Sequence, residues 1–220
     1  MKDVYTMTDT IQNGDCIDFL RKMPDKCIDL VLTDPPYGIG NKFTSEFGLS
    51  IIKKERGTFD WNDKIPADDV FNEIFRVSKN QIIFGGNYYK CLPTTNAWIV
   101  WDKKGDYDLC NPFSDCELAW TSFNHPIRKF TCIQQGFIKS DKKTKRIHPT
   151  QKPLPLFRAI IEKYTKPNDI VLDPFSGSGT TACACYELKR KFICIEKDEG
   201  YYEASIKRLQ EFSRQGILDL

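Results

Sequence analysis

Short apolar runs alternate with amphipathic stretches along most of this chain. Strand-forming runs occupy positions 28–33, 81–84, 97–101, 117–120, 170–172 and 192–195. Helical periodicity lies between them, at positions 15–23, 67–77, 154–164, 179–188 and 199–212. Apolar strands separated by helices are typical of a mostly parallel sheet that is covered on both faces. The sequence therefore predicts an α/β fold.

Length and composition favour one ordinary globular domain. The 220 residues allow a sizeable core but leave little room for a second one, so we expect a single domain over 1–220. No secretory segment or run of about 18 apolar residues occurs, which favours a cytoplasmic protein. The nine cysteines stand singly in apolar stretches and are expected to be reduced and mostly buried. No CxxC pair occurs and there are two histidines, so no metal site is expected.

A glycine-rich turn follows the strand expected at 170–172. It runs from Asp173 to Thr180 and leads into a helix, whose first turn offers free N–H groups to a ligand. It lacks the lysine of a Walker A loop and the full glycine spacing of a dinucleotide fingerprint. Alone, it is also compatible with an ordinary strand-to-helix connection. The next strand ends about 20 residues on at Glu196, whose carboxylate can accept from ribose hydroxyls. Together the two features predict a nucleoside cofactor without phosphates, such as S-adenosyl-L-methionine.

The tetrapeptide Asp34-Pro35-Pro36-Tyr37 follows the strand expected at 28–33. Its two prolines remove backbone donors and stiffen the turn. The Asp34 carboxylate and the Pro35 carbonyl are then available as acceptors, and Tyr37 offers a flat ring. A strand-ending turn with a surface Asp and a packed Tyr is the plainer alternative. Because this tetrapeptide and Asp173 both follow strands, we expect them at the same edge of the sheet.

Two long segments interrupt the alternation of strands and helices. Residues 38–64 are polar and follow the tetrapeptide directly, and loops of this length are usually functional or mobile. They contain Phe59-Asp60-Trp61, which could form a lid or pack in the interior, and Phe43 and Phe47, for which no role is assigned. Residues 123–148 include a run with five positive charges and one negative charge. This run is either a solvated loop or a contact to nucleic-acid phosphates.

These motifs, taken together and in this order, resemble the beta group of amino-methyltransferases that act on DNA. In that group a D-P-P-Y-like tetrapeptide precedes the glycine-rich cofactor loop, and the resemblance spans nearly the whole chain. It implies a Rossmann-like S-adenosylmethionine-dependent methyltransferase fold. The sheet would have seven strands, mostly parallel, with strand seven antiparallel between strands five and six. A catalytic half (about 1–122), a short basic segment (about 123–147) and a cofactor half (about 148–220) would follow one another.

The resemblance also implies roles for individual residues. Asp15 would accept from the adenine amino group of the cofactor, and the segment His148 to Pro153 would line its methionine end. The expected catalytic residues are Asp34, Pro35, Pro36 and Tyr37. The expected cofactor contacts are Asp15, Cys16, Asp34, Lys152, Asp173, Pro174, Phe175, Ser176, Gly177, Ser178, Gly179, Thr180, Glu196 and Lys197. The expected nucleic-acid contacts are Lys139, Lys142, Lys143, Lys145 and Arg146.

The expected reaction is transfer of a methyl group to the N6 amino group of adenine. Hydrogen bonds from that amino group to Asp34 and the Pro35 carbonyl would localise the nitrogen lone pair for in-line attack. The base would have to be flipped out of the duplex, and Tyr37 would stack on it. Cytosine ring-carbon methylation is not expected, because none of the twelve prolines precedes a cysteine. The H-x-E and P-C-x-x-C patterns of zinc deaminases are also missing.

Alternatives to adenine-N6 methylation of DNA remain at this stage. Cytosine N4 is the nearest one, since Asp at the first position of the tetrapeptide indicates adenine only as a preference. An RNA adenine methyltransferase and a non-catalytic nucleic-acid-binding subunit are the others. The basic segment is shorter than the recognition insert of many family members, so a short target site, low specificity or a specificity partner is expected. A homodimer and a cognate restriction enzyme are further expected partners, in a prokaryote or a phage.

Overall fold

The computed structural model describes residues 4–39, 64–107, 114–135, 138–139 and 146–218. Its main feature is an eight-stranded sheet in the order β1-β10-β9-β2-β3-β5-β4-β6. These strands are β1 (Thr10–Asn13), β2 (Ile28–Thr33), β3 (Ser78–Phe84), β4 (Trp98–Asp102), β5 (Cys116–Thr121), β6 (Arg128–Thr131), β9 (Ile170–Asp173) and β10 (Lys191–Glu196). A separate hairpin pairs β7 (Gln134–Gln135) with β8 (Ile138–Lys139).

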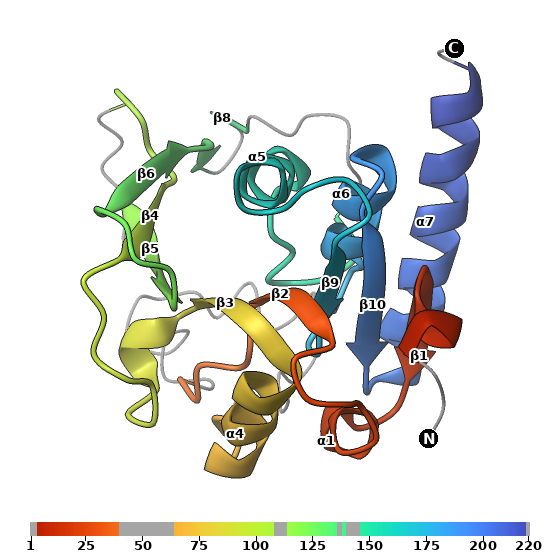
Figure 1. The fold of residues 1–220 in the computed structure, drawn as a ribbon. Helices are drawn as coiled ribbons and strands as arrows, with labels where there is room; N and C mark the ends of the chain where they lie inside the picture. Colours follow the sequence, from red (N-terminus) through yellow and green to blue (C-terminus); the bar gives the residue numbers. More distant parts are fainter. Residues whose placement is uncertain (1–3, 40–63, 108–113, 136–137, 140–145, 219–220) are drawn as a thin grey trace.

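Within the described residues, five α-helices flank the sheet on its two faces (Figure 1). Helices α1 and α4 lie on one face, and α5, α6 and α7 lie on the other. Their bounds are α1 (Cys16–Leu20), α4 (Asp68–Val77), α5 (Leu154–Tyr164), α6 (Thr180–Glu187) and α7 (Glu199–Leu218). Short 3₁₀ turns cover η1 (Val4–Met7) and η3 (Gly86–Tyr88). No helix in the described part of the chain is both long and apolar enough to cross a bilayer.

The two faces of the sheet bury separate apolar clusters. Along β2, Leu30 and Leu32 pack with residues of α5 and α6, whereas Val31 packs with residues of α4. Ile82 and Ile83 of β3 divide between the clusters in the same way. Strands that are buried on both sides must be apolar at every position, which explains the continuous runs in the sequence.

The expected α/β methyltransferase topology is confirmed, with one strand more than predicted. Strand β5 lies between β3 and β4 and runs antiparallel to both, as expected for the one reversed strand. The additional strand is β6, which pairs with β4 at the edge of the sheet. It falls in the segment 123–148 that the sequence leaves irregular, and its residues are mostly exposed, so no apolar pattern marks it.

The switch in chain direction lies between β2 and β9, and it determines where a site can form. From β2 the chain passes through α4 to β3, and from β9 it passes through α6 to β10 on the other side. All four strands are parallel, so their carboxyl ends meet at one edge. At such a switch point the two connections diverge and leave a crevice.

Burial in the central strands makes a stability prediction. Ile82 is fully buried between the helices and the neighbouring strands, whereas Ile127 is 60% exposed. We expect Ile82→Ala to lower the free energy of unfolding by about 2 to 5 kcal/mol. Ile127→Ala makes the same chemical change at the surface and should alter it by less than about 0.5 kcal/mol. Urea unfolding of both variants measures the difference, and equal losses would contradict the described core.

Candidate active site

A cavity of about 750 Å³ opens at the carboxyl edge of the parallel strands. It lies at the switch point, with wall residues that follow or end β2, β9 and β10. Its volume is in the range typical of pockets for small molecules and cofactors. The cavity is therefore the candidate active site.

Most residues that the sequence singles out for cofactor binding line this cavity. The structure brings together Asp15, Cys16, Asp34, Lys152, Asp173, Pro174, Phe175, Ser176, Gly177, Ser178, Thr180, Glu196 and Lys197. Pro36 of the tetrapeptide also lines it. Gly179, Pro35 and Tyr37 are absent from its wall. Gly179 instead precedes α6 as its N-cap and has a positive φ of 69°, which suits a residue without a side chain.

Asp173 is fixed at the end of β9 by two hydroxyl groups. Thr33 Oγ1 donates to Asp173 Oδ1 over 2.8 Å, and Thr181 Oγ1 donates to Asp173 Oδ2 over 2.5 Å. The backbone N–H of Phe175 adds a third bond at 3.2 Å. Burial raises the pKa of Asp173 to about 6, although these donors oppose the shift. The bond to Thr33 also joins β9 to β2 directly across the switch point.

Glu196 holds the glycine-rich turn against the end of β10. Its two carboxylate oxygens accept from the backbone N–H groups of Gly177 and Asp198, each over 2.8 Å. Burial raises the pKa of Glu196, and the two N–H groups oppose that shift. Nearby, the Ser176 hydroxyl is buried and has no hydrogen-bond partner among the described residues. A buried hydroxyl on the wall of a cavity is suited to a polar group of a bound ligand.

Asp15 and Lys197 are paired with each other at the same cavity. Lys197 Nζ lies 2.9 Å from Asp15 Oδ2, and Asp15 Oδ1 accepts from the backbone N–H of Ile17 as the N-cap of α1. The bond from Lys197 lowers the pKa of Asp15. Six acidic residues and three lysines line the cavity, and this excess of acidic groups favours a ligand with positive charge; they are Asp15, Asp34, Asp69, Asp173, Glu196 and Asp198, with Lys64, Lys152 and Lys197.

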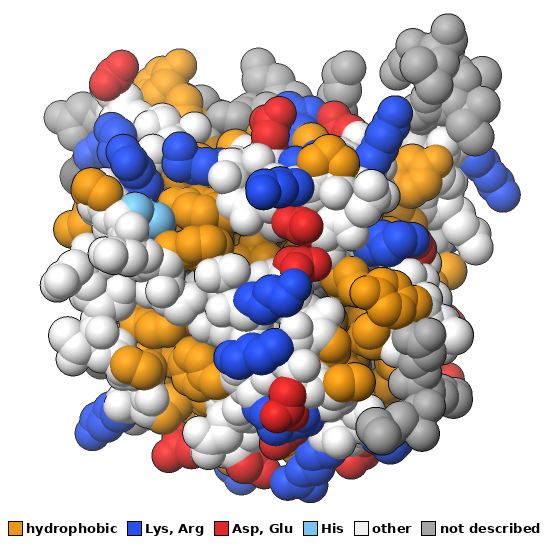
Figure 2. Space-filling model, viewed as in Figure 1, with side chains coloured by type: hydrophobic (Ala, Val, Ile, Leu, Met, Phe, Trp, Pro, Cys, Tyr) orange, Lys and Arg blue, Asp and Glu red, His pale blue; other side chains and the backbone are white. Residues whose placement is uncertain are grey.

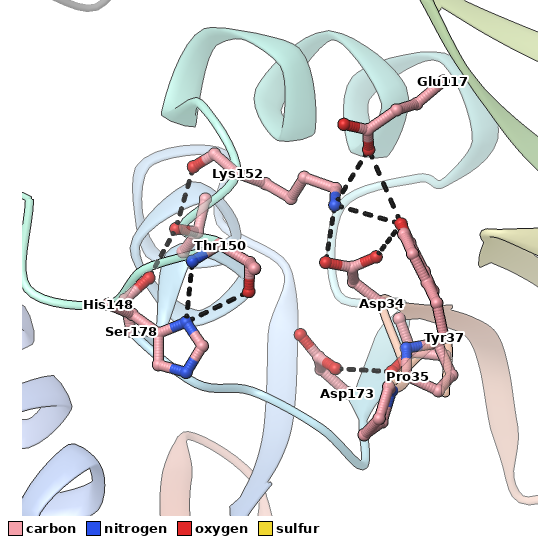
Figure 3. Close-up of polar contacts among 12 residues, drawn as sticks. Asp34, Pro35, Tyr37, Glu117, His148, Thr150, Lys152, Asp173 and Ser178 are labelled. Carbon is pink, nitrogen blue, oxygen red and sulfur yellow. Dashed lines mark hydrogen bonds and ion pairs between the residues drawn. The ribbon is translucent and has the colours of Figure 1, made fainter. Parts of the chain in front are cut away.

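The Asp34 carboxylate is held on both oxygens (Figure 3). Lys152 Nζ lies 2.5 Å from Asp34 Oδ2, and the Tyr37 hydroxyl donates to Asp34 Oδ1 over 2.6 Å. Lys152 Nζ is also 3.1 Å from Glu117 Oε2. The sequence places Lys152 among the cofactor contacts, and the structure shows that its ammonium group is directed to Asp34 and Glu117.

The other members of the tetrapeptide have partners within the protein. The Tyr89 hydroxyl donates to the Pro35 carbonyl over 2.8 Å. The ring of Tyr37 is stacked on that of Tyr88, with centroids 4.9 Å apart and an interplanar angle of 15°. Gly85 packs so closely that an added Cβ would lie 2.1 Å from Tyr37 Cε1. Tyr37 is thus firmly packed, and its face toward Tyr88 is not available to a base.

The cavity wall also includes residues outside the expected catalytic and cofactor contacts. His148 and Tyr201 both line the cavity, and their rings meet edge to face with centroids 4.3 Å apart. Burial, reinforced by Lys152 and Arg146, lowers the pKa of His148 to about 4, so its ring is neutral near neutral pH. His148 begins the segment that resembles the one at the methionine end of the cofactor, so the sequence already indicates it. Tyr201 lies on a helix and carries no comparable signal.

The expected nucleic-acid contacts fall mostly outside the described residues. Lys142, Lys143 and Lys145 lie there, as do Phe43, Phe47 and Phe59-Asp60-Trp61. Lys139 belongs to β8, but its side chain is not described. Arg146 is exposed, and its Nε donates to the His148 carbonyl over 3.3 Å. On the face drawn in Figure 2, the basic side chains are interspersed with acidic and apolar ones.

Three bacterial proteins are similar to this chain over most of its length. Type II methyltransferase M.HinfI of Haemophilus influenzae is 29% identical, covering 96% of this chain and 70% of the relative. Type II methyltransferase M2.MboI of Moraxella bovis is also 29% identical, covering 92% of this chain and 88% of the relative. Putative methylase YubD of Escherichia coli K12 is 28% identical, covering 91% and 90%.

Solved structures share the fold. A putative DNA modification methylase of Thermus thermophilus, complexed with S-adenosyl-L-methionine, aligns with a TM-score of 0.59 at 18% identity, covering 92% of this chain and 93% of its own. The complex of M1.HpyAVI with the same cofactor gives 0.56 at 24% identity, covering 90% and 98%. PvuII DNA methyltransferase, described as cytosine-N4-specific, gives 0.56 at 18% identity, covering 94% and 91%.

A family model described as DNA methylase, for enzymes of the N6 and N4 type, matches residues 66–207. The match covers well over half of the 220 residues and includes the glycine-rich turn and Glu196, although Asp34 precedes it. This match agrees with the resemblance of the sequence motifs to those of the amino-methyltransferases that act on DNA. The chain belongs to the N6/N4 family of S-adenosylmethionine-dependent DNA methyltransferases.

Proposed function

We propose that this protein transfers a methyl group from S-adenosyl-L-methionine to the N6 amino group of adenine in DNA. The observation that carries the proposal is the position of Asp34 in the cavity. Asp34 follows β2, whose neighbour in the sheet is β9, and β9 is in turn next to β10. The ends of β9 and β10 carry Asp173 and Glu196, which line the same cavity as Asp34. A group that accepts from an amino nitrogen therefore faces the same space as the residues suited to a nucleoside cofactor.

The residues of the cavity fit S-adenosyl-L-methionine. Glu196 is an acceptor for its ribose hydroxyls, and Ser176 offers a buried hydroxyl without a partner among the described residues. The excess of acidic over basic residues on the wall favours the positive charge of the cofactor. When bound, the cofactor supplies an electrophilic methyl group on a sulfonium centre. Asp15 is the candidate partner of the adenine amino group of the cofactor. Its carboxylate would then accept from that amino group either together with Lys197 or in place of it.

Asp34 and Pro35 are the candidate acceptors for the amino group of the target base. Each Asp34 oxygen has one donor from the protein and can accept a second bond. The Pro35 carbonyl accepts from Tyr89 and likewise has a second lone pair. Two such bonds orient the amino nitrogen and stabilise the positive charge that develops on it during methyl transfer. The Tyr37 hydroxyl contributes by holding Asp34, while stacking of the base on its ring stays a prediction.

The choice of adenine rests on Asp34 at the first position of the tetrapeptide, the residue that resembles the adenine-directed enzymes. Cytosine N4 is the second candidate, because the cytosine-N4-specific PvuII enzyme has a similar fold. Incubation with labelled cofactor and duplex DNA, followed by nucleoside analysis, tests the base. N6-methyladenine is expected, and N4-methylcytosine alone would contradict the proposal. Parallel reactions with single-stranded DNA and RNA test the nucleic acid.

The proposed partners follow from this function. DNA is the substrate, and the basic run at 139–146 is its candidate phosphate contact. A homodimer, a specificity partner and a cognate restriction enzyme stay predictions, as does a cytoplasmic location. Size-exclusion chromatography with light scattering, with and without DNA, tests the first of these.

Asp34 and Glu196 are predicted to have separable roles. Asp34→Asn removes the negative acceptor and should lower kcat at least about 100-fold, with the affinity for the cofactor nearly unchanged. Glu196→Gln loses charged hydrogen bonds and should weaken cofactor binding about 10- to 100-fold. Calorimetry with S-adenosyl-L-methionine and a methyl-transfer assay measure the two quantities.

A matched control for these variants is Asp25→Asn, since the Asp25 side chain is 75% exposed and lies away from the cavity. It should keep both cofactor binding and activity. Equal loss of cofactor affinity in the Asp34 and Glu196 variants would contradict the division of roles. Failure of the unaltered protein to bind S-adenosyl-L-methionine would favour a non-catalytic nucleic-acid-binding subunit.

The basic run is predicted to contact phosphates. Replacing Lys142, Lys143 and Lys145 with Ala should weaken DNA binding and reduce the slope of log affinity against log salt by about 2 to 3. A triple replacement of the exposed Lys163, Lys166 and Lys189 removes the same charge, away from the cavity. Fluorescence anisotropy over a salt series measures both. If the two triple variants show the same slope, the run is a solvated loop.

A further inference from the structure

Behind Asp34 lies a chain of four side chains with alternating charge. Lys152 Nζ is 2.5 Å from Asp34 Oδ2 and 3.1 Å from Glu117 Oε2. Lys103 Nζ is in turn 3.1 Å from Glu117 Oε1. The four residues come from separate segments, namely those that follow β2, precede α5, form β5 and follow β4. The fold therefore brings these four charges into a row from segments that are distant in the sequence.

Only the inner end of this row meets the cavity. Asp34 and Lys152 line it, whereas Glu117 and Lys103 do not. The side chains of Lys152, Lys103, Asp34 and Glu117 are 8%, 13%, 15% and 25% exposed. Burying charges is costly, and a single ion pair would suffice to neutralise Asp34. A second pair behind the first therefore calls for a functional explanation.

Glu117 acts on both groups that hold Asp34. It accepts from Lys152, and the Tyr37 hydroxyl lies 3.5 Å from Glu117 Oε2 as well as 2.6 Å from Asp34 Oδ1 (Figure 3). Lys152 Nζ also lies 3.3 Å from the Tyr37 hydroxyl. Asp34, Tyr37, Glu117 and Lys152 thus form a closed ring of contacts, in which Asp34 and Glu117 lie opposite each other. Glu117 therefore fixes the direction of the Lys152 ammonium group without lining the cavity.

The surroundings of Lys152 keep its ammonium group in place. Nζ lies 5.2 Å from the ring centre of Phe84, 5.6 Å from that of Tyr37 and 5.7 Å from that of Trp101. Aromatic faces attract a cation and leave little room for another position. The only acidic partners recorded for Lys152 among the described residues are Asp34 and Glu117.

We propose that Glu117 and Lys152 are positioning residues, which fix the orientation and the charge of the Asp34 carboxylate for the amino group of the target base. Lys103 balances Glu117 at the outer end of the row. This inference rests on the proposed role of Asp34 in methyl transfer. It accounts for the second buried ion pair and for the donor on each Asp34 oxygen.

The charge effects have definite signs. Burial raises the pKa of Asp34, Lys152 lowers it, and the negative charge of Glu117 raises it again. Burial opposes the charge of Lys152, but Asp34 and Glu117 together raise its pKa, so it stays protonated. For Glu117, burial is outweighed by Lys152 and Lys103, which lower its pKa. The other ionisable groups that interact with Asp34 are Tyr37, Tyr89 and Asp173.

Two substitutions that do not touch Asp34 test the proposal. Glu117→Gln keeps the shape but removes a negative charge, so the Asp34 carboxylate should stay ionised to lower pH. The acid limb of kcat/KM against pH should then move to lower pH. Lys103→Gln removes a positive charge, so its acid limb should move to higher pH. Glu117→Gln should also lower kcat about 10- to 100-fold, since it weakens buried charged hydrogen bonds.

Cofactor affinity and thermal unfolding of both variants serve as controls, and both should stay close to those of the unaltered protein. A purely structural role would lower activity without moving the two acid limbs in opposite directions. Unshifted limbs in both variants, or shifts of the same sign, would overturn the proposal. If Glu117→Gln fails to fold, Lys103→Gln decides alone, and an unshifted or lowered acid limb would overturn it. The kcat and kcat/KM values of each variant are compared with those of the unaltered protein on the base that it methylates. A wrong adenine assignment would appear in the nucleoside analysis of the unaltered protein and would leave this comparison intact.

Discussion

The ion pair between Asp34 and Lys152 is the contact on which the site depends. It joins residues 118 positions apart, one from each half of the chain, at the switch point of the sheet. Without Lys152, a carboxylate would be left in a largely buried position where ionisation is unfavourable. Without Asp34, the Lys152 ammonium group would keep Glu117 as its one acidic partner among the described residues. Each half of the chain therefore completes the electrostatics of the other, and the cavity is formed where they meet.

The tetrapeptide that carries Asp34 is held rigidly by the protein. Pro35 and Pro36 restrict the backbone, the Tyr89 hydroxyl holds the Pro35 carbonyl, and Tyr37 is packed against Tyr88 and Gly85. Asp34 is thus oriented by its own backbone and by its partners before any ligand binds. Preorganised acceptors stabilise developing charge without rearranging during the reaction, which is where fixed protein groups surpass water.

Much of the fold could be predicted from the sequence, because buried elements leave strong patterns. The strand Ile28–Thr33 and the helix Leu154–Tyr164 have the expected bounds. The edge strands β1 and β6 could not be predicted, because their residues are largely polar or exposed and lack an apolar pattern. Most of the expected cofactor residues do line one cavity, since they follow strands whose carboxyl ends meet.

The interactions within the site were harder to predict. Glu117 lies in a predicted strand, but nothing in the sequence indicates that it meets Lys152 and Tyr37. Lys152 belongs to a segment that resembles a cofactor-binding one, so its bond to Asp34 could not be inferred from the motif. Pairs of this kind depend on the relative placement of distant elements. A sequence motif specifies which groups reach an edge of the sheet, but their partners there follow from the three-dimensional fold.

The sheet order also bears on when the cavity can form during synthesis of the chain. Strands β9 and β10 of the cofactor half lie between β1 and β2 of the catalytic half, because β1 pairs with β10 and β2 pairs with β9. Strand β1 therefore joins the sheet only after β10 has been translated. Asp15, which follows β1 closely, is then among the last residues to take its place on the cavity wall.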